Sequence, residues 1–389
     1  IDQGGMMLLN SHASSAPNIH SLMQKSANMT NTYVGHLDAH TAVGHMAIGT
    51  GAYPVKSQVI GNTFFSMEKS GGKERLTKSE IYATKDETKV SPDELKAESL
   101  GDVLNRANNG QSVIVAQSYA LRASIGMAGH GAQPFDKAQA PKVSANNYVY
   151  WLDATKSKWI TDTRYYALPR VAAASDVILR YNKFYPHGFE GYQIKNTKSA
   201  LEHWGIMMST PVETQLEGEL VRAVVEQEIL GKKKDKDGFT DLVYVSFKSA
   251  DAVGHHFGYH SLEAAETLAE IDKQIAALLQ FLRQHYGDNF AFVLTADHGC
   301  APSSEISGGA RLTAEEVIDA IDTLLPKEIA ADLSLVRFMT VGQISLNHEL
   351  MQKYNISQAA IVEKIMAIRP DGKNFFRQVL TRKDLGLGG

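Results

Sequence analysis

Two short stretches decide the fold: Asp251-Ala-Val-Gly-His255 and Thr295-Ala-Asp297-His298-Gly299. Each follows a short apolar run that is typical of a buried strand, Leu242–Phe247 before the first and Phe290–Leu294 before the second. We therefore expect a carboxylate and an imidazole at the end of each strand. Oxygen and nitrogen ligands of this kind suit Zn²⁺. Two such pairs in one domain predict a two-metal site of the kind that clamps the oxygens of a phosphate ester.

The segment between the two motifs predicts a long amphipathic helix over Leu262–Tyr286. Its apolar residues recur at helical spacing on one stripe: Leu268, Ile271, Ile275, Leu278, Leu279 and Leu282. Strand, helix and strand form a βαβ unit, whose two strands are expected to be parallel in one sheet. Ligands of such α/β sheets gather at the carboxyl ends of the strands, which is where both motifs fall.

Composition excludes several classes of function. The chain has 389 residues, a net charge of −4 and a pI of about 6.4, so no basic surface indicates binding to nucleic acid. No apolar run approaches the ~20 residues of a membrane-spanning helix. The single cysteine, Cys300, excludes both an intrachain disulfide and a cysteine-rich zinc site.

The chain is expected to consist of three parts. Residues 1–118 and 210–389 are predicted to form the first and second parts of a catalytic α/β core. Residues 119–209 are rich in aromatic side chains and are predicted to form an inserted cap, with the aromatics as its own small core. Because Ile1-Asp2 reads like the end of a strand, we expect the core to be truncated at both ends.

A third informative stretch is Thr41-Ala-Val-Gly-His45-Met-Ala-Ile-Gly-Thr50-Gly-Ala-Tyr-Pro54. Thr41 stands just before an apolar helical turn, and a helix N-terminus favours an anion or an alkoxide. A neighbouring metal ion would lower the pKa of the hydroxyl, so Thr41 is a candidate nucleophile that needs no Ser-His-Asp triad. The alternative is an ordinary threonine N-cap.

Together these motifs resemble the alkaline phosphatase superfamily, and within it the branch of type I phosphodiesterases/nucleotide pyrophosphatases and phosphate-irrepressible alkaline phosphatases. The resemblance runs from Asp2 to about Phe338. It implies a three-layer α/β sandwich with a mainly parallel central sheet and an aromatic-rich insertion. It also implies a small phosphorylated substrate and a periplasmic or secreted location. The oligomeric state does not follow from the sequence.

The resemblance assigns roles to individual residues. It implies two Zn²⁺ ions, one surrounded by Asp2, Thr41, Asp297 and His298, the other bound by Asp251 and His255. Thr41 would be the nucleophile that forms a phospho-threonine intermediate, and Asn62 and Arg122 would hold phosphoryl oxygens.

Two departures from the branch matter. In that branch, the third ligand of the second zinc is a His near the C-terminus that is followed by Gly. This sequence lacks it, because the one His after His298 is His348, which is followed by Glu349. The phosphomonoesterases of this branch carry Lys-x-Arg before Ala-Gly-His. Here Ala120-Leu-Arg122 precedes Ala128-Gly-His130, so Ala120 replaces the lysine.

We therefore expect zinc-dependent hydrolysis of phosphate esters, with a phosphomonoesterase as the first hypothesis. A phosphodiesterase or nucleotide pyrophosphatase is the alternative, favoured by the missing lysine. A further alternative is a non-catalytic metal-binding relative, suggested by the missing His. Sulfatases are disfavoured because Cys300 lacks the Cys-x-Pro-x-Arg context, and cofactor-independent phosphoglycerate mutases because Thr41 stands where they have Ser.

Overall fold

Contacts divide the chain of the computed structural model into two units, Ile1–Ala301 and Pro302–Gly389. The residues that the structure describes are 9, 12–70, 73–82, 90–131, 146–153, 156–184, 205, 207–340 and 342–386. Asp2 lies outside them. The boundaries expected after residues 118 and 209 stay predictions.

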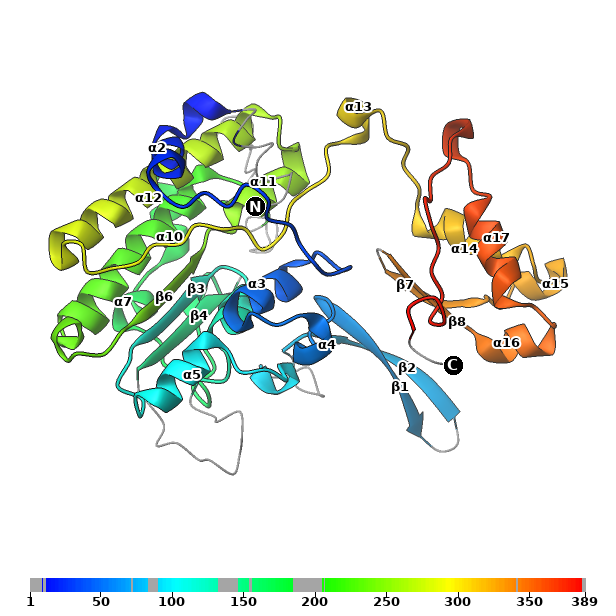
Figure 1. The fold of residues 1–389 in the computed structure, drawn as a ribbon, viewed down its shortest axis with the longest axis horizontal. Coiled ribbons are helices and arrows are strands. Elements are labelled where there is room, and N and C mark those ends of the chain that lie inside the picture. The colour runs from blue at the N-terminus through cyan, green and yellow to red at the C-terminus, as the bar shows by residue number, and fades with distance from the viewer. Residues whose placement is uncertain are drawn as a thin grey trace. The chain divides into compact units, whose positions relative to one another are not determined.

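The first unit is built on a four-stranded sheet of order β5-β4-β3-β6 (Figure 1). Its strands are β3 (Ile114–Ser118), β4 (Asn147–Asp153), β5 (Lys158–Ile160) and β6 (Leu242–Ser246). β3 pairs in parallel with both β4 and β6, and β5 pairs antiparallel with β4. The sheet is therefore mainly parallel, as predicted, and β3 and β6 end at the same edge.

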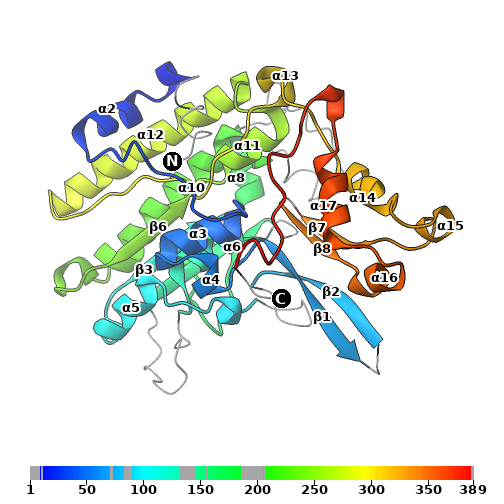
Figure 2. The ribbon, with the colours of Figure 1, turned by 45° about the vertical axis from the view of Figure 1, so that its right-hand side comes forward.

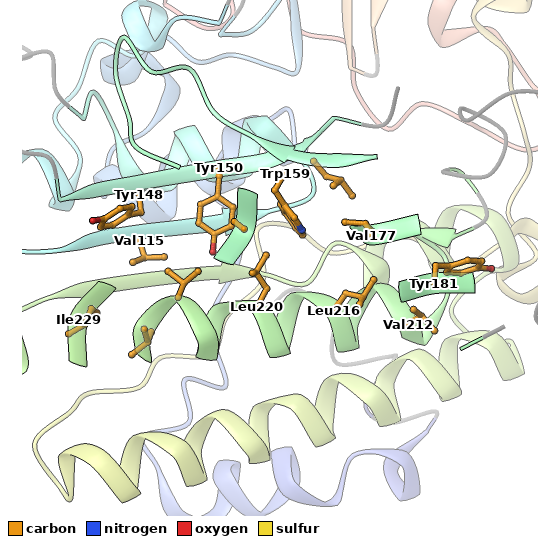
Figure 3. Close-up of a cluster of buried hydrophobic side chains, with 14 of the residues drawn as sticks. Val115, Tyr148, Tyr150, Trp159, Val177, Tyr181, Val212, Leu216, Leu220 and Ile229 are labelled. Carbon is orange, nitrogen blue, oxygen red and sulfur yellow. The ribbon is translucent and has the colours of Figure 1, made fainter. Parts of the chain in front are cut away.

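Side chains along β3 point alternately to the two faces of the sheet, so each face presents apolar groups on which helices pack. Val113 and Val115 face a cluster that includes Leu216 and Leu220 of α10 (Pro211–Val224). Ile114 and Ala116 face the opposite cluster, which includes residues of α3 (Thr41–Thr50) and α6 (Leu121–Ala128). The predicted three-layer α/β sandwich is thus confirmed, with α12 (Leu262–Tyr286) packed against the outer side of α10 (Figures 1 and 3).

The buried aromatic residues that the structure describes between residues 119 and 209 belong to the core of the first unit. Tyr148 and Tyr150 of β4 and Trp159 of β5 point from the sheet toward α10 (Figure 3). Tyr150 and Trp159 pack edge to face, with ring centroids 5.7 Å apart. The expectation that these aromatics form a small core of their own is therefore wrong, because strands from their segment complete the central sheet.

The helix predicted over Leu262–Tyr286 has those bounds as α12. Ser261 caps it by accepting a hydrogen bond from Ala264 N, and Gly287, with φ 60°, ends it. Four residues of the predicted stripe are buried: Leu268, Ile271, Ile275 and Leu279.

The strand predicted over residues 290–294 is wrong for the described structure. These residues pair with no strand that the structure describes, and β6 lies at the edge of the sheet. Phe290 and Phe292 pack on the cluster around α12, whereas Val293 is 83% exposed. The continuous apolar run Phe-Ala-Phe-Val-Leu predicts a strand, but such a run carries no information on whether a neighbouring strand accepts the pairing.

The remaining elements of the first unit surround this sandwich. They include an antiparallel hairpin of β1 (Thr63–Ser70) and β2 (Lys73–Glu80). The helices not yet described are η1 (Ala13–Ser15), α2 (Pro17–Lys25), α4 (Pro54–Ser57), η2 (Pro92–Glu94), α5 (Leu100–Ala107), α7 (Arg170–Ala173), α8 (Val177–Phe184), η3 (Val225–Leu230), η4 (Lys234–Lys236) and α11 (Ser249–Phe257).

The second unit has its own hydrophobic cluster around Ile321, Leu335 and Ile361. Its strands β7 (Val336–Thr340) and β8 (Gln343–Leu346) form a hairpin beside helices (Figure 2). Those helices are α14 (Ala314–Asp322), α15 (Lys327–Ala330), α16 (His348–Lys353) and α17 (Gln358–Met366), and the unit also contains α13 (Ser304–Ser307) and η5 (Pro370–Gly372). In the described part of the chain, no helix combines the length and apolar character that a membrane span requires.

Candidate active site

The candidate site lies at the sheet edge where β3 and β6 end. α3 begins there at Thr41, and its backbone N-cap is His40, whose side chain makes no capping hydrogen bond. Thr41 is therefore the first helical residue and not the N-cap, so the alternative of an ordinary threonine cap does not hold. Thr41 is buried, with 4% of its surface exposed.

The Thr41 hydroxyl meets a lysine that follows β6. Lys248 Nζ donates to Thr41 Oγ1 over 3.2 Å, and the same ammonium forms an ion pair with Asp251. Sequence reasoning did not identify Lys248. A signal was present, because Lys248 stands three residues before Asp251, a spacing that lets two side chains meet along a helical turn.

Asp297 lies beside α3 through His45. His45 Nδ1 is 3.0 Å from Asp297 Oδ2 and 2.9 Å from the Thr41 carbonyl oxygen. His45 Nε2 is 3.0 Å from Ser246 Oγ at the end of β6. His45 is 5% exposed. Its imidazole thus links the start of α3, the end of β6 and the second predicted metal motif.

Gly44 makes this close approach of α3 possible. A Cβ atom at residue 44 would lie 2.1 Å from the carbonyl oxygen of Asp297. That separation is far below van der Waals contact, so only glycine fits at this point of the helix.

The two predicted metal motifs meet at this edge, although residues 290–294 form no strand. His298 Nε2 is 3.7 Å from Asp251 Oδ1 and 3.5 Å from Asp297 Oδ2. His255 Nε2 is 3.4 Å from Asp251 Oδ2, but its side chain is 75% exposed. The structure therefore brings Asp251, Asp297 and His298 together and places His255 on the solvent side of Asp251.

Asp297 is held in its charged form by its neighbours. Burial alone would raise the pKa of Asp297, but His45, His298 and Lys248 together hold that pKa well below its ordinary value. A charged carboxylate that is mostly removed from water needs such partners. It is also the form that binds a metal ion.

The residues at this edge fit a divalent metal in their chemistry. Aspartate oxygens and a histidine nitrogen are ordinary zinc ligands, and both carboxylates are largely buried, with 17% and 19% of the Asp251 and Asp297 side chains exposed. Among the described residues, however, no group of three or more His, Cys, Asp or Glu side chains is arranged to hold a metal ion. Asp2, the remaining predicted carboxylate ligand, lies outside those residues.

Asn62 and Arg122, the two predicted phosphoryl contacts, differ in their placement. Asn62 Oδ1 accepts a hydrogen bond from Ala42 N over 2.9 Å, so the side chain lies at the N-terminus of α3 beside Thr41. Arg122, near the start of α6, has its Nη1 atom 3.7 Å from Glu80 Oε2 of β2. This ion pair directs the guanidinium to the hairpin and not to Thr41.

Two buried acids lie behind this edge, and sequence reasoning missed them. Glu213 and Glu217, one helical turn apart on α10, are 0% exposed. Glu217 Oε1 accepts a hydrogen bond from Tyr119 N over 3.0 Å. The backbone N–H of Lys248 lies close enough to the same carboxylate to favour its charged form. One carboxylate thus lies beside the residues that follow β3 and β6.

Burial raises the pKa of Glu213 to about 8. Burial and the neighbouring Glu213 raise the pKa of Glu217 well above its ordinary value. The pair therefore carries fewer than two negative charges at neutral pH.

A cavity of about 290 Å³ adjoins the site on the Asp297 side of α3. Its lining includes Tyr33, Tyr53, Gly44, Ile48 and Asp297, whereas Thr41 and Lys248 are not part of it. The cavity therefore neighbours Asp297 and does not contain the threonine hydroxyl.

This three-layer sandwich has a threonine and Asp-His pairs at the carboxyl edge of its sheet. The protein belongs to the alkaline phosphatase superfamily. The sequence profile of the family "Type I phosphodiesterase / nucleotide pyrophosphatase" matches residues 1–385, and the chain belongs to that family.

Three curated relatives are similar to this chain. The alkaline phosphatase PhoV of Synechococcus elongatus is 27% identical over 309 residues, which cover 72% of this chain and 53% of PhoV. The alkaline phosphatase PafA of Elizabethkingia meningoseptica is 27% identical over 315 residues, which cover 72% of this chain and 55% of PafA. A protein of Myroides odoratus described as a calcium-transporting ATPase is 26% identical over 382 residues, 88% of this chain and 66% of that protein.

The crystal structure of wild-type PafA superimposes with a TM-score of 0.72 at 20% sequence identity, covering 92% of this chain and 73% of that one. This likeness confirms the fold. The chain spans between 53% and 66% of the length of these three curated relatives.

Proposed function

We propose that this protein hydrolyses phosphate esters, with Thr41 as the nucleophile and a divalent metal, zinc by its donor chemistry, as the cofactor. The observation that carries the proposal is that Asp251, Asp297 and His298 converge at one sheet edge, where Lys248 bridges Asp251 to the Thr41 hydroxyl. Membership of the phosphodiesterase family and the relatives named alkaline phosphatases support the same reaction class.

The proposed reaction has two displacement steps. Thr41 Oγ1 loses its proton and forms a bond to phosphorus, while the bond from phosphorus to the ester oxygen breaks and the departing alcohol takes up a proton. Water then attacks the phospho-threonine, which releases phosphate and restores the hydroxyl. The metal ions, when bound, supply positive charge that stabilises the attacking and leaving oxygens.

The residues of this chain bind and orient the reacting groups. Asp2, Thr41, Asp297 and His298 would hold one metal ion, and Asp251 and His255 the other. Because Asn62 Oδ1 accepts a hydrogen bond from Ala42 N, the amide N–H groups of Asn62 would be directed toward the phosphoryl oxygens. Arg122 is proposed as a second phosphoryl contact and would have to leave Glu80 to reach it.

A phosphomonoesterase is the first candidate because two of the three relatives described above are named alkaline phosphatases. A phosphodiesterase or nucleotide pyrophosphatase is the second candidate. It is favoured by Ala120, which stands where the branch's monoesterases have lysine. A non-catalytic metal-binding relative is the third. A periplasmic or secreted location belongs to the same proposal.

A panel of aryl phosphate monoesters and diesters, assayed with and without added zinc, tests these candidates. Zinc-dependent release of the aryl alcohol from monoesters supports the first, and preferential release from diesters supports the second. Zinc binding without turnover of any ester would leave the non-catalytic candidate.

A further inference from the structure

Lys248 is a cation directly beside the proposed nucleophile. Its Nζ lies 3.2 Å from Thr41 Oγ1, and it forms an ion pair with Asp251. The side chain is 14% exposed, so the ammonium is mostly screened from solvent. A charge in such a position interacts more strongly with an anion than a surface lysine does.

The backbone at Lys248 and Ser249 is held in place by residues of α10. The backbone N–H of Lys248 lies close enough to the carboxylate of Glu217 to favour its charged form, and Glu217 Oε1 accepts a hydrogen bond from Tyr119 N. The next residue, Ser249, is 0% exposed, and its hydroxyl is hydrogen bonded to that of Thr214 on α10. The main chain is therefore anchored to α10 while the ammonium extends to Thr41, which reduces the entropy lost when an anion binds.

Other candidate cations are engaged elsewhere. Arg122 pairs with Glu80, Lys156 with Asp153 and Arg164 with Asp162. In the described part of the chain, no second lysine or arginine donates a hydrogen bond to the Thr41 hydroxyl.

Residue 120 supplies no charge to this edge. Ala120 is 7% exposed and packs in a buried cluster with Ala123 and Met127.

We propose that Lys248 is a substrate-binding residue whose ammonium contacts a non-bridging oxygen of the phosphoryl group at Thr41 and thereby favours dianionic phosphate monoesters over monoanionic diesters. The inference rests on the proposed function and goes further, since it names the residue that selects the substrate class. A second negative charge on the substrate gains more from a fixed cation than a single charge does.

The test compares Lys248→Met with Lys234→Met. Lys234 is a matched control, because it also pairs with an aspartate three residues away and is similarly covered, with 18% of its side chain exposed. Lys234 bonds to Gln111, which precedes β3, and so lies at the opposite end of the sheet. Binding is measured by calorimetry at pH 8 with inorganic phosphate, a dianion, and with dimethyl phosphate, a monoanion.

We expect Lys248→Met to weaken inorganic phosphate binding roughly tenfold to a hundredfold, the range for a charged hydrogen bond, and to affect dimethyl phosphate much less. The ratio of kcat/KM for an aryl monoester to that for a diester should fall by a similar factor. Lys248→Arg should retain most of the phosphate affinity, and Lys234→Met should match the wild type in both measurements.

An unchanged phosphate affinity in Lys248→Met overturns the inference and leaves Lys248 as a partner of Asp251 alone. Equal losses for phosphate and dimethyl phosphate overturn it as well. If Lys248→Met does not fold, Lys248→Gln, which keeps donors for Thr41 without the charge, makes the same comparison. A wild type that hydrolyses neither ester contradicts the proposed function, whereas the calorimetric comparison still decides the role of Lys248.

Discussion

At the scale of single residues, the proposed chemistry depends on one hydroxyl. Thr41→Ala should lower ester hydrolysis roughly a thousandfold or more, because the residue that forms the covalent intermediate is gone. The free energy of unfolding should change by only about 1 kcal/mol, since a single hydrogen bond, the one from Lys248, is lost. Steady-state kinetics and thermal unfolding of the same preparation measure both quantities.

Thr41→Ser is the matched control, because it keeps the hydroxyl and removes only a methyl group. It should retain a substantial part of the activity. Undiminished zinc-dependent hydrolysis by Thr41→Ala would show that the nucleophile is a different group.

The sequence predicted Thr41, Asp251, Asp297 and His298 as neighbours, and the structure brings the last three together. Their motifs are local, since each pair follows an apolar run. Lys248, Glu213 and Glu217 were not predicted, because their importance depends on contacts between distant parts of the chain. A glutamate on an amphipathic helix is ordinarily solvated, and only the packing of α10 on the sheet removes these two from water.

At the scale of elements, α3 can lie against Asp297 because residue 44 is glycine. Gly44→Ala would place a methyl carbon 2.1 Å from the Asp297 carbonyl oxygen, so the helix and the metal motif must move apart. We expect a loss of about 1–3 kcal/mol in stability, typical of overpacking, and a marked loss of activity. Gly309→Ala, whose nearest neighbour, Ser307 Oγ, is 3.1 Å away, is the control. Equal activity in the two variants would contradict the close approach of α3 to Asp297.

The buried acids of helix α10 make the stability of the folded state depend on pH. The pKa of Glu213 is raised to about 8 in the folded state, above the ordinary value of about 4.3 that applies to the unfolded chain. The folded state therefore binds the proton more tightly, and ionisation of Glu213 destabilises it as the pH rises between these two values. Glu213→Gln should raise the unfolding temperature more at pH 9 than at pH 5.

Unfolding curves of the wild type and of Glu213→Gln across this pH range test the prediction. Glu226→Gln, a change in the nearby π-helical segment η3, provides a control outside the buried pair. A stability difference between wild type and Glu213→Gln that is independent of pH would show that Glu213 does not ionise within this window.

Elements were predictable where periodicity and end signals agreed. The apolar stripe of α12 predicted both bounds of that helix, which the structure shows to be capped by Ser261 and ended by Gly287. Residues 290–294 have the continuous apolar composition of a buried strand, but a strand also needs a neighbour with free backbone groups, and that depends on the whole fold. The aromatic segment after residue 119 was interpreted as separate because its composition differs, although Tyr148 and Tyr150 lie in the central sheet.

At the scale of the whole molecule, the chain consists of two units with separate hydrophobic clusters. Units with their own cores can unfold as separate cooperative transitions. All described candidate ligands, namely Thr41, Asp251, His255, Asp297 and His298, belong to the first unit. Calorimetry should therefore resolve two transitions, of which only that of the first unit shifts when zinc is added.

The size of this shift follows from linkage between binding and folding. A metal that binds only the folded state stabilises it by about 2.7 kcal/mol at a free concentration of 100 Kd. Asp297→Asn removes a charged ligand and should abolish most of this stabilisation and lower the zinc content, which elemental analysis measures.

Leu335→Ala, a truncation in the core of the second unit, identifies the other transition. It should lower that transition alone, since emptying a buried leucine site costs about 2–5 kcal/mol. A zinc shift of equal size in the wild type and in Asp297→Asn would place the metal on other residues, and a zinc-dependent shift of the transition that responds to Leu335→Ala would place it in the second unit.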